Sequence, residues 1–173
     1  MATFIGKNLK DFTAKFAGIG YRGALDRFMP PKIIPLLEEH RASGMDTPID
    51  LDMGIDKLTT ELRFRGFYAS LLDDVGLKDL DSTQVEVKGA LEDAIDGTVE
   101  NVTYNMTGKI TSYDPGDWLI GTENATVTLT LTLTYLKISV NGVVKQEIDV
   151  LNAKRIVNGV DQRAAINAAL HAA

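Results

Sequence analysis

The stretch that decides the fold is ATVTLTLTLTYLKISV, residues 125–140. Valine and leucine at the odd positions 127–133 alternate with threonine at the even positions 126–134. This is the two-residue period of a β-strand with one buried and one wet face. After Tyr135 the apolar side chains shift to even positions, at Leu136, Ile138 and Val140. Because one inserted residue reverses the faces of a strand, the sequence predicts a bulge or bend near Tyr135.

Further strand signals surround this stretch. Asn141-Gly142 predicts a tight hairpin turn, and Asp96-Gly97 predicts another. Residues 114–117, Asp-Pro-Gly-Asp, have the composition of a turn that closes a strand. The expected additional strands cover residues 59–67, 84–91, 99–113 and 143–148.

Two segments have helical spacing. Tyr68, Leu71, Leu72 and Val75 predict a short amphipathic helix over 68–75 that packs on a sheet, and Asp161 can cap a helix that runs to about Leu170. The expected fold is mainly β, of the α+β kind: a β-sandwich or partial barrel with one short flanking helix and a C-terminal helix. Because no linker or repeat interrupts residues 1–173, we expect a single domain.

Residues 36–57 fit neither period. Gly44, Pro48 and Gly54 punctuate the stretch, which predicts a long loop or extended arm. Long loops in small domains usually carry function or contact a partner.

Composition narrows the function classes. The 173 residues hold 18 Lys and Arg against 24 Asp and Glu, a net charge of −6, which argues against a protein that wraps its surface in nucleic acid. The acidity is concentrated in residues 73–123, with twelve acidic and three basic side chains. With no cysteine, disulfides, thiolate metal sites and cysteine nucleophiles are excluded. We expect folding in the cytoplasm, because no signal peptide or membrane span is evident.

Motifs that carry chemistry are incomplete. Gly18, Gly20 and Gly23 match a dinucleotide-binding pattern, but Pro30-Pro31 leaves no room for the helix that it needs, so a hairpin turn is the better interpretation. A calcium-loop register from Asp50 to Glu61 lacks its obligatory glycine, because Ile55 stands there.

Catalytic groups are equally sparse. His40 and His171 belong to no catalytic or metal motif, and Asp114 and Asp117 fit Asx turns better than a carboxylate pair. Trp118 is expected to anchor a core or an interface. We therefore predict no catalytic residues, no cofactor and no metal, and a protein that is not an enzyme.

Several strings, in order along most of the chain, resemble the major tail tube proteins of contractile-tailed bacteriophages and of R-type pyocins, the phage-tail-like bacteriocins. They are Tyr21-Arg22-Gly23, Pro31-Lys32-Ile33, the long string EEHRASGMDTPI at 38–49, Leu51-Asp52-Met53-Gly54, Tyr113-Asp114-Pro115-Gly116-Asp117-Trp118 and Val157-Asn158-Gly159-Val160-Asp161. The string at 38–54 and the final Asn-Gly-Val-Asp are the most specific.

The resemblance implies a structural subunit of a virion tail, assembled in a bacterial cytoplasm. Six copies would join their sheets into a ring with a continuous inner β-barrel, and rings would stack into a tube. The implied partners are the chain itself, the sheath protein, the tape-measure protein, the baseplate hub and the tail terminator. DNA would pass through the lumen without sequence-specific binding, unless the tube is the puncturing tube of a bacteriocin.

The resemblance suggests two candidate surfaces, one for contacts between subunits and one for the lumen or another wet surface. The arm and Trp118 are expected at subunit interfaces, through Glu38, Glu39, His40, Arg41, Met45, Asp46, Pro48, Leu51, Asp52, Met53 and Trp118. The polar strand faces are expected to line the lumen or another wet surface, through Thr126, Thr128, Thr130, Thr132 and Thr134 on one strand and Thr103, Asn105, Thr107 and Lys109 on the other. Threonine suits such a wall because it favours strands while presenting hydroxyls to water.

Three alternatives remain open at this point. A type VI secretion tube protein has a related ring architecture. A monomeric β-barrel that binds a small ligand fits the strands but leaves the arm unexplained, and a hydrolase is the least supported.

Overall fold

A computed structural model describes residues 6–121 and 125–171 of the chain. Strands dominate it, as expected for a mainly β fold. In chain order the elements are β1 (Asn8–Phe16), β2 (Ile19–Gly20), β3 (Leu25–Met29), β4 (Pro35–His40), β5 (Ile49–Ile55), β6 (Thr59–Arg65), the 3-10 turn η1 (Ala69–Leu71), β7 (Thr83–Glu92), β8 (Val99–Asp114), β9 (Thr126–Val140), β10 (Val143–Asp149), β11 (Lys154–Val157), β12 (Val160–Asp161) and the helix α1 (Ala164–His171).

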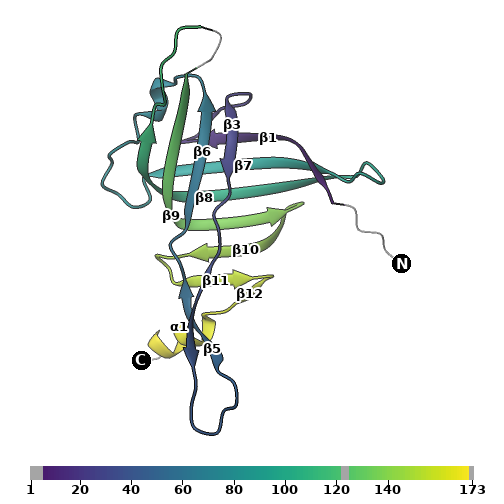
Figure 1. The fold of residues 1–173 in the computed structure, drawn as a ribbon, viewed down its shortest axis with the longest axis vertical. Helices are drawn as coiled ribbons and strands as arrows, with labels where there is room; N and C mark the ends of the chain where they lie inside the picture. The colour runs from purple at the N-terminus through teal and green to yellow at the C-terminus, as the bar shows by residue number, and fades with distance from the viewer. Residues whose placement is uncertain (1–5, 122–124, 172–173) are drawn as a thin grey trace.

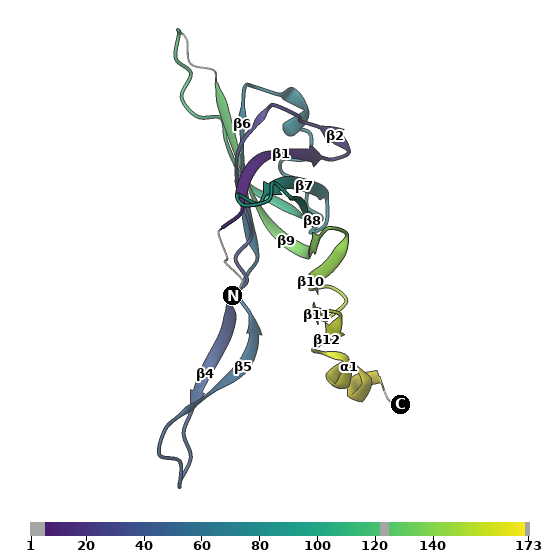
Figure 2. The ribbon, with the colours of Figure 1, turned by 90° about the vertical axis from the view of Figure 1, so that its right-hand side faces the viewer.

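The strands form two layers around one core. The back layer has the strand order β12-β11-β10-β9-β8-β7-β1-β2. The front layer contains β3 and β6 together with the first half of β9 and the end of β8, paired in the order β3-β6-β9-β8. Figure 1 shows the front strands running across the back strands, and Figure 2 shows the two layers from the side. This is a sandwich with crossed layers.

Strand β9 belongs to both layers. Its residues 126–132 pair with β6, whereas residues 135–140 pair with β10. Between these halves Thr134 is an extra residue, because Thr107 pairs with Tyr135 and Gly108 pairs with Leu133. The predicted bulge near Tyr135 is therefore confirmed, and it lies where the sheet turns the corner.

Gly108 makes the corner sterically feasible. A Cβ atom at this position would clash with the Thr132 carbonyl oxygen and lie 2.9 Å from Leu133 Cα. Only glycine lets β8 and β9 approach this closely at the bulge.

The core lies between the layers. Leu129, Leu131 and Leu62 of the front layer are fully buried against Phe16 and Val87 of the back layer. Burying side chains of this size stabilises a fold by about 2 kcal/mol each. The odd-numbered apolar positions of residues 127–133 thus face inward, as their alternation predicts.

The two predicted hairpin turns are confirmed. Val140 pairs with Val143 across Asn141 and Gly142, and both turn residues have positive φ, as a type I′ turn requires. Residues 93–98, which contain Asp96-Gly97, connect β7 to β8. The glycine pattern at 18–23 begins with the β1–β2 turn at Ala17 and Gly18, which agrees with the hairpin interpretation.

Of the two helix predictions, the first needs correction and the second, the C-terminal helix, is confirmed. Over 68–75 the structure has only the 3-10 turn η1: Leu71 is fully buried and Tyr68 and Val75 pack half-buried against the core, whereas Leu72 is 40% exposed. The C-terminal helix begins at Ala164, whereas Asp161 ends β12 and accepts a 2.9 Å hydrogen bond from the Arg163 amide.

The turn expected at 114–117 is wider than predicted. Asp114 Oδ1 accepts a 2.9 Å hydrogen bond from the Gly116 amide, which is the Asx turn that the sequence favours. Strand β9 begins only at Thr126, however, so a longer connection separates the two strands.

Candidate assembly surfaces

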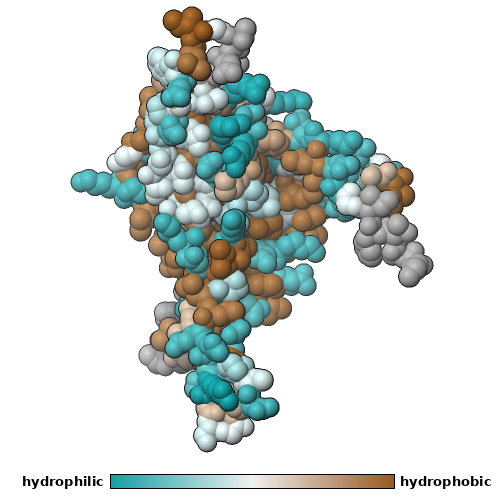
Figure 3. All heavy atoms as spheres, viewed as in Figure 1, coloured by the Kyte–Doolittle hydropathy of each residue, from teal (hydrophilic) through white to brown (hydrophobic). Residues whose placement is uncertain are grey.

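The outward face of the front layer is polar. Thr126, Thr128, Thr130 and Thr132 pair with Arg65, Arg63, Glu61 and Thr59 of β6. Cross-strand partners share a face, so these side chains form one continuous surface, on the side opposite the buried leucines. Figure 3 shows it in pale and teal over β6 and β9.

Ion pairs on this face balance its charge. Asp26 lies at a register shift in β3 and accepts a 2.9 Å hydrogen bond from Arg63 Nε. Arg65 Nη2 lies 3.4 Å from the second oxygen of the same carboxylate. The charges on β6 were visible in the sequence, but their partner was not, because Asp26 lies 37 residues before Arg63.

The second predicted polar face looks in another direction. Thr103, Asn105 and Thr107 belong to the back-layer half of β8, where their partners on β7 are Lys88, Glu86 and Gln84. Thr103, which was expected on a wet face, is buried in the single chain. Lys109 pairs with Thr132 at the corner and continues the front face. Thr134 is half-buried at the bulge, and its hydroxyl donates a 3.3 Å hydrogen bond to the Thr107 carbonyl. The two sets of polar residues are therefore not one surface.

The front layer has a free edge on each side. Within the described part of the chain, strand β3 pairs with β6 alone. The pairing of β8 with β7 ends at Gly108, so residues 109–114 of β8 pair with β9 alone. Unpaired strand edges are ready to pair with another chain.

The stretch 36–57 contains a two-stranded hairpin, β4–β5, which we call the arm (residues 35–55). Figure 2 shows it projecting below the two layers. The predicted residues Glu38, Glu39, His40, Leu51, Asp52 and Met53 lie on its two strands, and Arg41, Met45, Asp46 and Pro48 lie at its tip. The tip is closed by Arg41, whose Nε donates a 3.4 Å hydrogen bond to the Met45 carbonyl.

The arm has two different faces. Leu37 pairs with Asp52 and Glu39 pairs with Asp50, which makes one face largely acidic. The other face carries Leu36, Ile49, Leu51 and Met53, which are 41–59% exposed, together with Glu38 and His40, the cross-strand partners of Leu51 and Ile49. Exposed apolar side chains in such a row are typical of a contact surface.

One ion pair holds the arm to the body. Arg155 of β11 donates hydrogen bonds from both Nη atoms to the carboxylate of Asp52, with 3.3 Å between Nη1 and Oδ1. The Arg155 guanidinium lowers the pKa of the Asp52 carboxyl, and the carboxylate in turn raises the pKa of Arg155.

Trp118 lies far from the arm. The segment that follows β8, in which Trp118 lies, is at the opposite end of the long axis of the molecule from the arm (Figure 1), and the Trp118 side chain is 71% exposed. Its ring meets Phe67 edge-on, with 6.0 Å between ring centroids. Leu119 and Ile120 beside it are also exposed. Trp118 is thus not a core anchor in the single chain.

Chemical sites are not evident among the described residues. No group of three or more histidine, aspartate or glutamate side chains gathers there as a metal site would. Asp50 and Asp56 lie apart on the exposed arm and the linker after it, and Asp52 is engaged by Arg155. No helix within the described ranges is long and apolar enough to cross a membrane.

Comparison with known proteins adds the decisive observation. A family model described as phage tail tube protein FII matches residues 6–170. The chain belongs to the phage tail tube protein family.

Relatives of this tail tube protein match it over most of its length. The tail tube protein of Escherichia phage P2 is 27% identical over 90% of this chain and 92% of its own length. The major tail tube protein of Serratia phage KSP20 is 29% identical over 86% of this chain and 85% of its own. The chain is accordingly a structural tail tube subunit, a component of a virion tail.

Solved structures share the fold. The sheath-tube complex of PVC, an extracellular contractile injection system, contains a chain with a TM-score of 0.55 and 15% identity, over 74% of this chain and 87% of that one. The tube-terminating cap of the anti-feeding prophage contains another, with a TM-score of 0.58 and 14% identity, over 80% and 94%. The tail tube protein therefore has the fold found in contractile injection systems.

Proposed function

We propose that six copies of this chain close into a ring whose channel is lined by the front layer, and that rings stack into a hollow tube inside a contractile sheath. The observation that carries the proposal is the four-stranded front layer with a free edge on each side. A head-to-tail contact between these edges repeats by rotation and closes into a ring.

The strand directions favour this closure. All pairs in the order β3-β6-β9-β8 are antiparallel, so β3 and β8 at the two edges run in opposite directions. Joining β3 of one copy to the end of β8 of the next therefore extends an antiparallel sheet without interruption. A closed barrel of this kind leaves no exposed edge.

The outward face of the front layer suits a conduit. Threonine hydroxyls from β9 and the Asp26–Arg63 pair present a polar surface to the channel, which also carries Arg27, the cross-strand partner of Arg63. Arginine that is already paired with aspartate offers less to DNA phosphates than free arginine does, so DNA would pass without adhering. The same wall serves the puncturing tube of a bacteriocin.

The arm and the Trp118 loop are placed for contacts between rings. They lie at opposite ends of the long axis (Figure 1), with the apolar row Ile49, Leu51 and Met53 at one end and Trp118, Leu119 and Ile120 at the other. The residues expected at interfaces, 38–53 and Trp118, would then contact neighbouring subunits. The back layer, with Asn105 and Lys88 on its outer face, is left for the sheath.

The remaining proposed partners would bind inside the tube or at its two ends. A tape-measure protein would occupy the lumen during assembly, while a baseplate hub and a tail terminator would bind its two end rings. These partners rest on the family rather than on any one surface of this chain.

Electron microscopy of the purified chain at high concentration tests the proposal. Rings or tubes with a central channel are expected. Particles that stay monomeric at every concentration and salt would contradict it, and would favour a small-ligand-binding barrel.

A further inference from the structure

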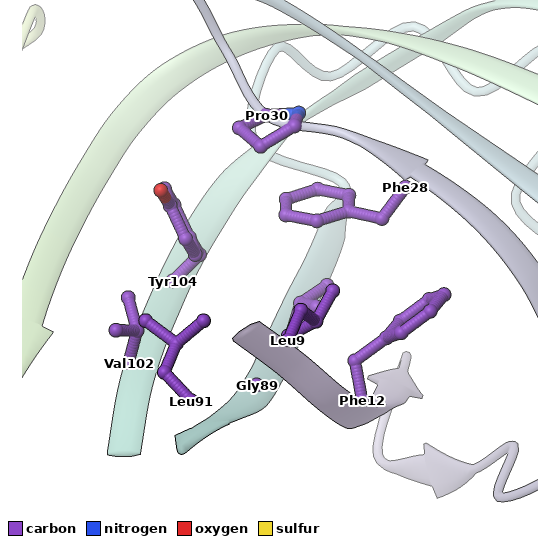
Figure 4. Close-up of a pocket in the computed structure, with 9 residues that line it drawn as sticks. Leu9, Phe12, Phe28, Pro30, Gly89, Leu91, Val102 and Tyr104 are labelled. Atoms are coloured by element: carbon purple, nitrogen blue, oxygen red, sulfur yellow. The ribbon is translucent and has the colours of Figure 1, made fainter. Parts of the chain in front are cut away.

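An apolar cavity opens on one side of the sandwich, between β3 and the back layer. It has a volume of about 380 Å³ and is lined by Leu9, Phe12, Phe28, Pro30, Leu91 and Tyr104, among others. Figure 4 shows these side chains converging from β1, β3, β7 and β8. Phe28 and Tyr104 meet edge-on with 5.4 Å between ring centroids, and Leu9 is still 56% exposed. The core is thus open to water on this side.

We propose that this cavity receives the crossover segment (residues 72–82) of the neighbouring copy in the ring, with Leu77 and Leu80 as the side chains that fill it. The proposal rests on the ring proposed above. It names a second contact between neighbouring copies, behind the front layer that lines the channel.

The two surfaces lie behind the two free edges. Phe28 belongs to the edge strand β3 and Pro30 follows it, so the cavity is directly behind that edge. The crossover segment lies beside the other edge, where Lys109 Nζ of β8 donates a 3.5 Å hydrogen bond to the Lys78 carbonyl. When β3 of one copy pairs with β8 of the next, the crossover segment of that next copy comes to the mouth of the cavity. This is a head-to-tail contact, which a ring repeats at every junction.

The side chains on both surfaces are apolar. Leu77 and Leu80 are 40% and 59% exposed, although they follow a turn whose Leu71 is fully buried. The crossover segment thus presents apolar side chains that its own chain does not cover, opposite a cavity that its own chain does not fill.

The charges are complementary as well. Asp73, Asp74, Asp79 and Asp81 of the crossover segment form no ion pair among the described residues. Around the edge strand β3, Arg22 and Lys32 form none there either, whereas Asp26 is engaged by Arg63 and Arg65. An acidic segment and a basic edge would meet in the ring, which favours the correct pairing over others.

Paired cysteines test the contact, since the chain has none of its own. The variant Leu80→Cys/Leu91→Cys is assembled into tubes and oxidised, and denaturing electrophoresis is expected to show a ladder of dimers and larger covalent oligomers. The matched control Leu80→Cys/Val143→Cys, with the second cysteine on the exposed side of β10, is expected to stay monomeric on the gel. Tubes of the Leu80→Cys/Leu91→Cys variant that give no ladder would overturn this contact while leaving the ring intact.

A second measurement applies if the double-cysteine variant does not assemble into tubes. Leu80→Asp is expected to lower tube yield at least tenfold with an unchanged thermal midpoint, whereas Leu80→Met and Val143→Asp retain assembly. Normal yield with Leu80→Asp would overturn the inference, as would saturable binding of an apolar dye to the cavity in assembled tubes. A strictly monomeric unmodified chain would overturn the ring and this contact together.

Discussion

Arg155 Nη1 donates a hydrogen bond of 3.3 Å to Asp52 Oδ1 and so ties β11 to arm strand β5 across 103 residues of sequence. Figure 2 shows the arm and the C-terminal strands as two projections from the body. This ion pair links the arm to the body in addition to Ile33 and Ile55, which pack against the core at the base of the arm.

The ion pair predicts a pH-dependent arm. The pKa of Asp52 is lowered in the folded chain by its hydrogen bond with Arg155. A group with a lowered folded-state pKa stabilises the fold above its unfolded value near 3.8, and this contribution is lost as the pH falls through the folded-state pKa. We expect the arm to loosen below about pH 4.

Spin labels at Pro48→Cys and Asn152→Cys can report this change through their distance distribution. The distribution is expected to broaden in acid, and to be broad at neutral pH in Asp52→Asn. Asp50→Asn, on the same face of the arm, is the control and keeps the narrow distribution. A narrow distribution in Asp52→Asn would show that the pair does not hold the arm.

Gly108→Ala is expected to disrupt the corner of the sheet. The new Cβ atom would meet the backbone of Thr132 and Leu133, which cannot move aside without breaking the bulge. The free energy of unfolding should fall by about 3 kcal/mol or more, measured by urea denaturation of the dilute monomer. Gly20→Ala has open space around its Cβ and should change it by less than about 0.5 kcal/mol. Equal stability of the two variants would contradict the role of Gly108.

The surroundings of Tyr135, beside the bulge, predict that its phenol ionises at unusually high pH. Burial, with the Glu147 carboxylate beside it, raises the pKa of Tyr135 to about 12. Because the folded-state pKa lies above the unfolded value near 10, the contribution of Tyr135 to stability is complete below pH 10 and is lost as the pH rises toward 12. Absorbance titration should show one tyrosine that ionises near pH 12, and Tyr135→Phe should remove that step. A step that persists in Tyr135→Phe would assign it elsewhere.

The apolar row on the arm predicts that rings can form without stacking into tubes when this row is changed. Met53→Asp places a charge in the row with Ile49 and Leu51, and burying that charge against the next ring is unfavourable. Single rings are expected to persist in electron micrographs while long tubes become rare. Val143→Asp, on β10 of the back layer, should still give long tubes. Tubes of normal length with Met53→Asp would exclude this face from the contact between rings.

The regular strands could be predicted from sequence because their burial is local and periodic. The threonine alternation at 126–134 and the parity change after Tyr135 identified β9 and its bulge, and the Asn-Gly step identified the turn to β10. Strand β1 was missed because its own register shift between Leu9 and Asp11 breaks the alternation.

Features that depend on distant parts of the chain were not predictable. The spacing of Leu71 and Leu72 suggested a helix, yet only Leu71 reaches the core. Nothing in the sequence links Asp26 to Arg63 or Asp52 to Arg155, since the pairing of β3 with β6 brings the first two together and the position of the arm beside β11 brings the other two together. The C-terminal helix carries Ile166 and Leu170, but both side chains are exposed in the single chain.

A cryo-electron microscopy reconstruction of assembled tubes at side-chain resolution tests the central claim most directly. The account predicts Thr128 and Thr130 on the channel wall, with β3 of each subunit hydrogen-bonded to residues 109–114 of its neighbour. A channel lined instead by Thr103 and Asn105 of the back layer, or a tube in which β3 remains unpaired, would contradict it.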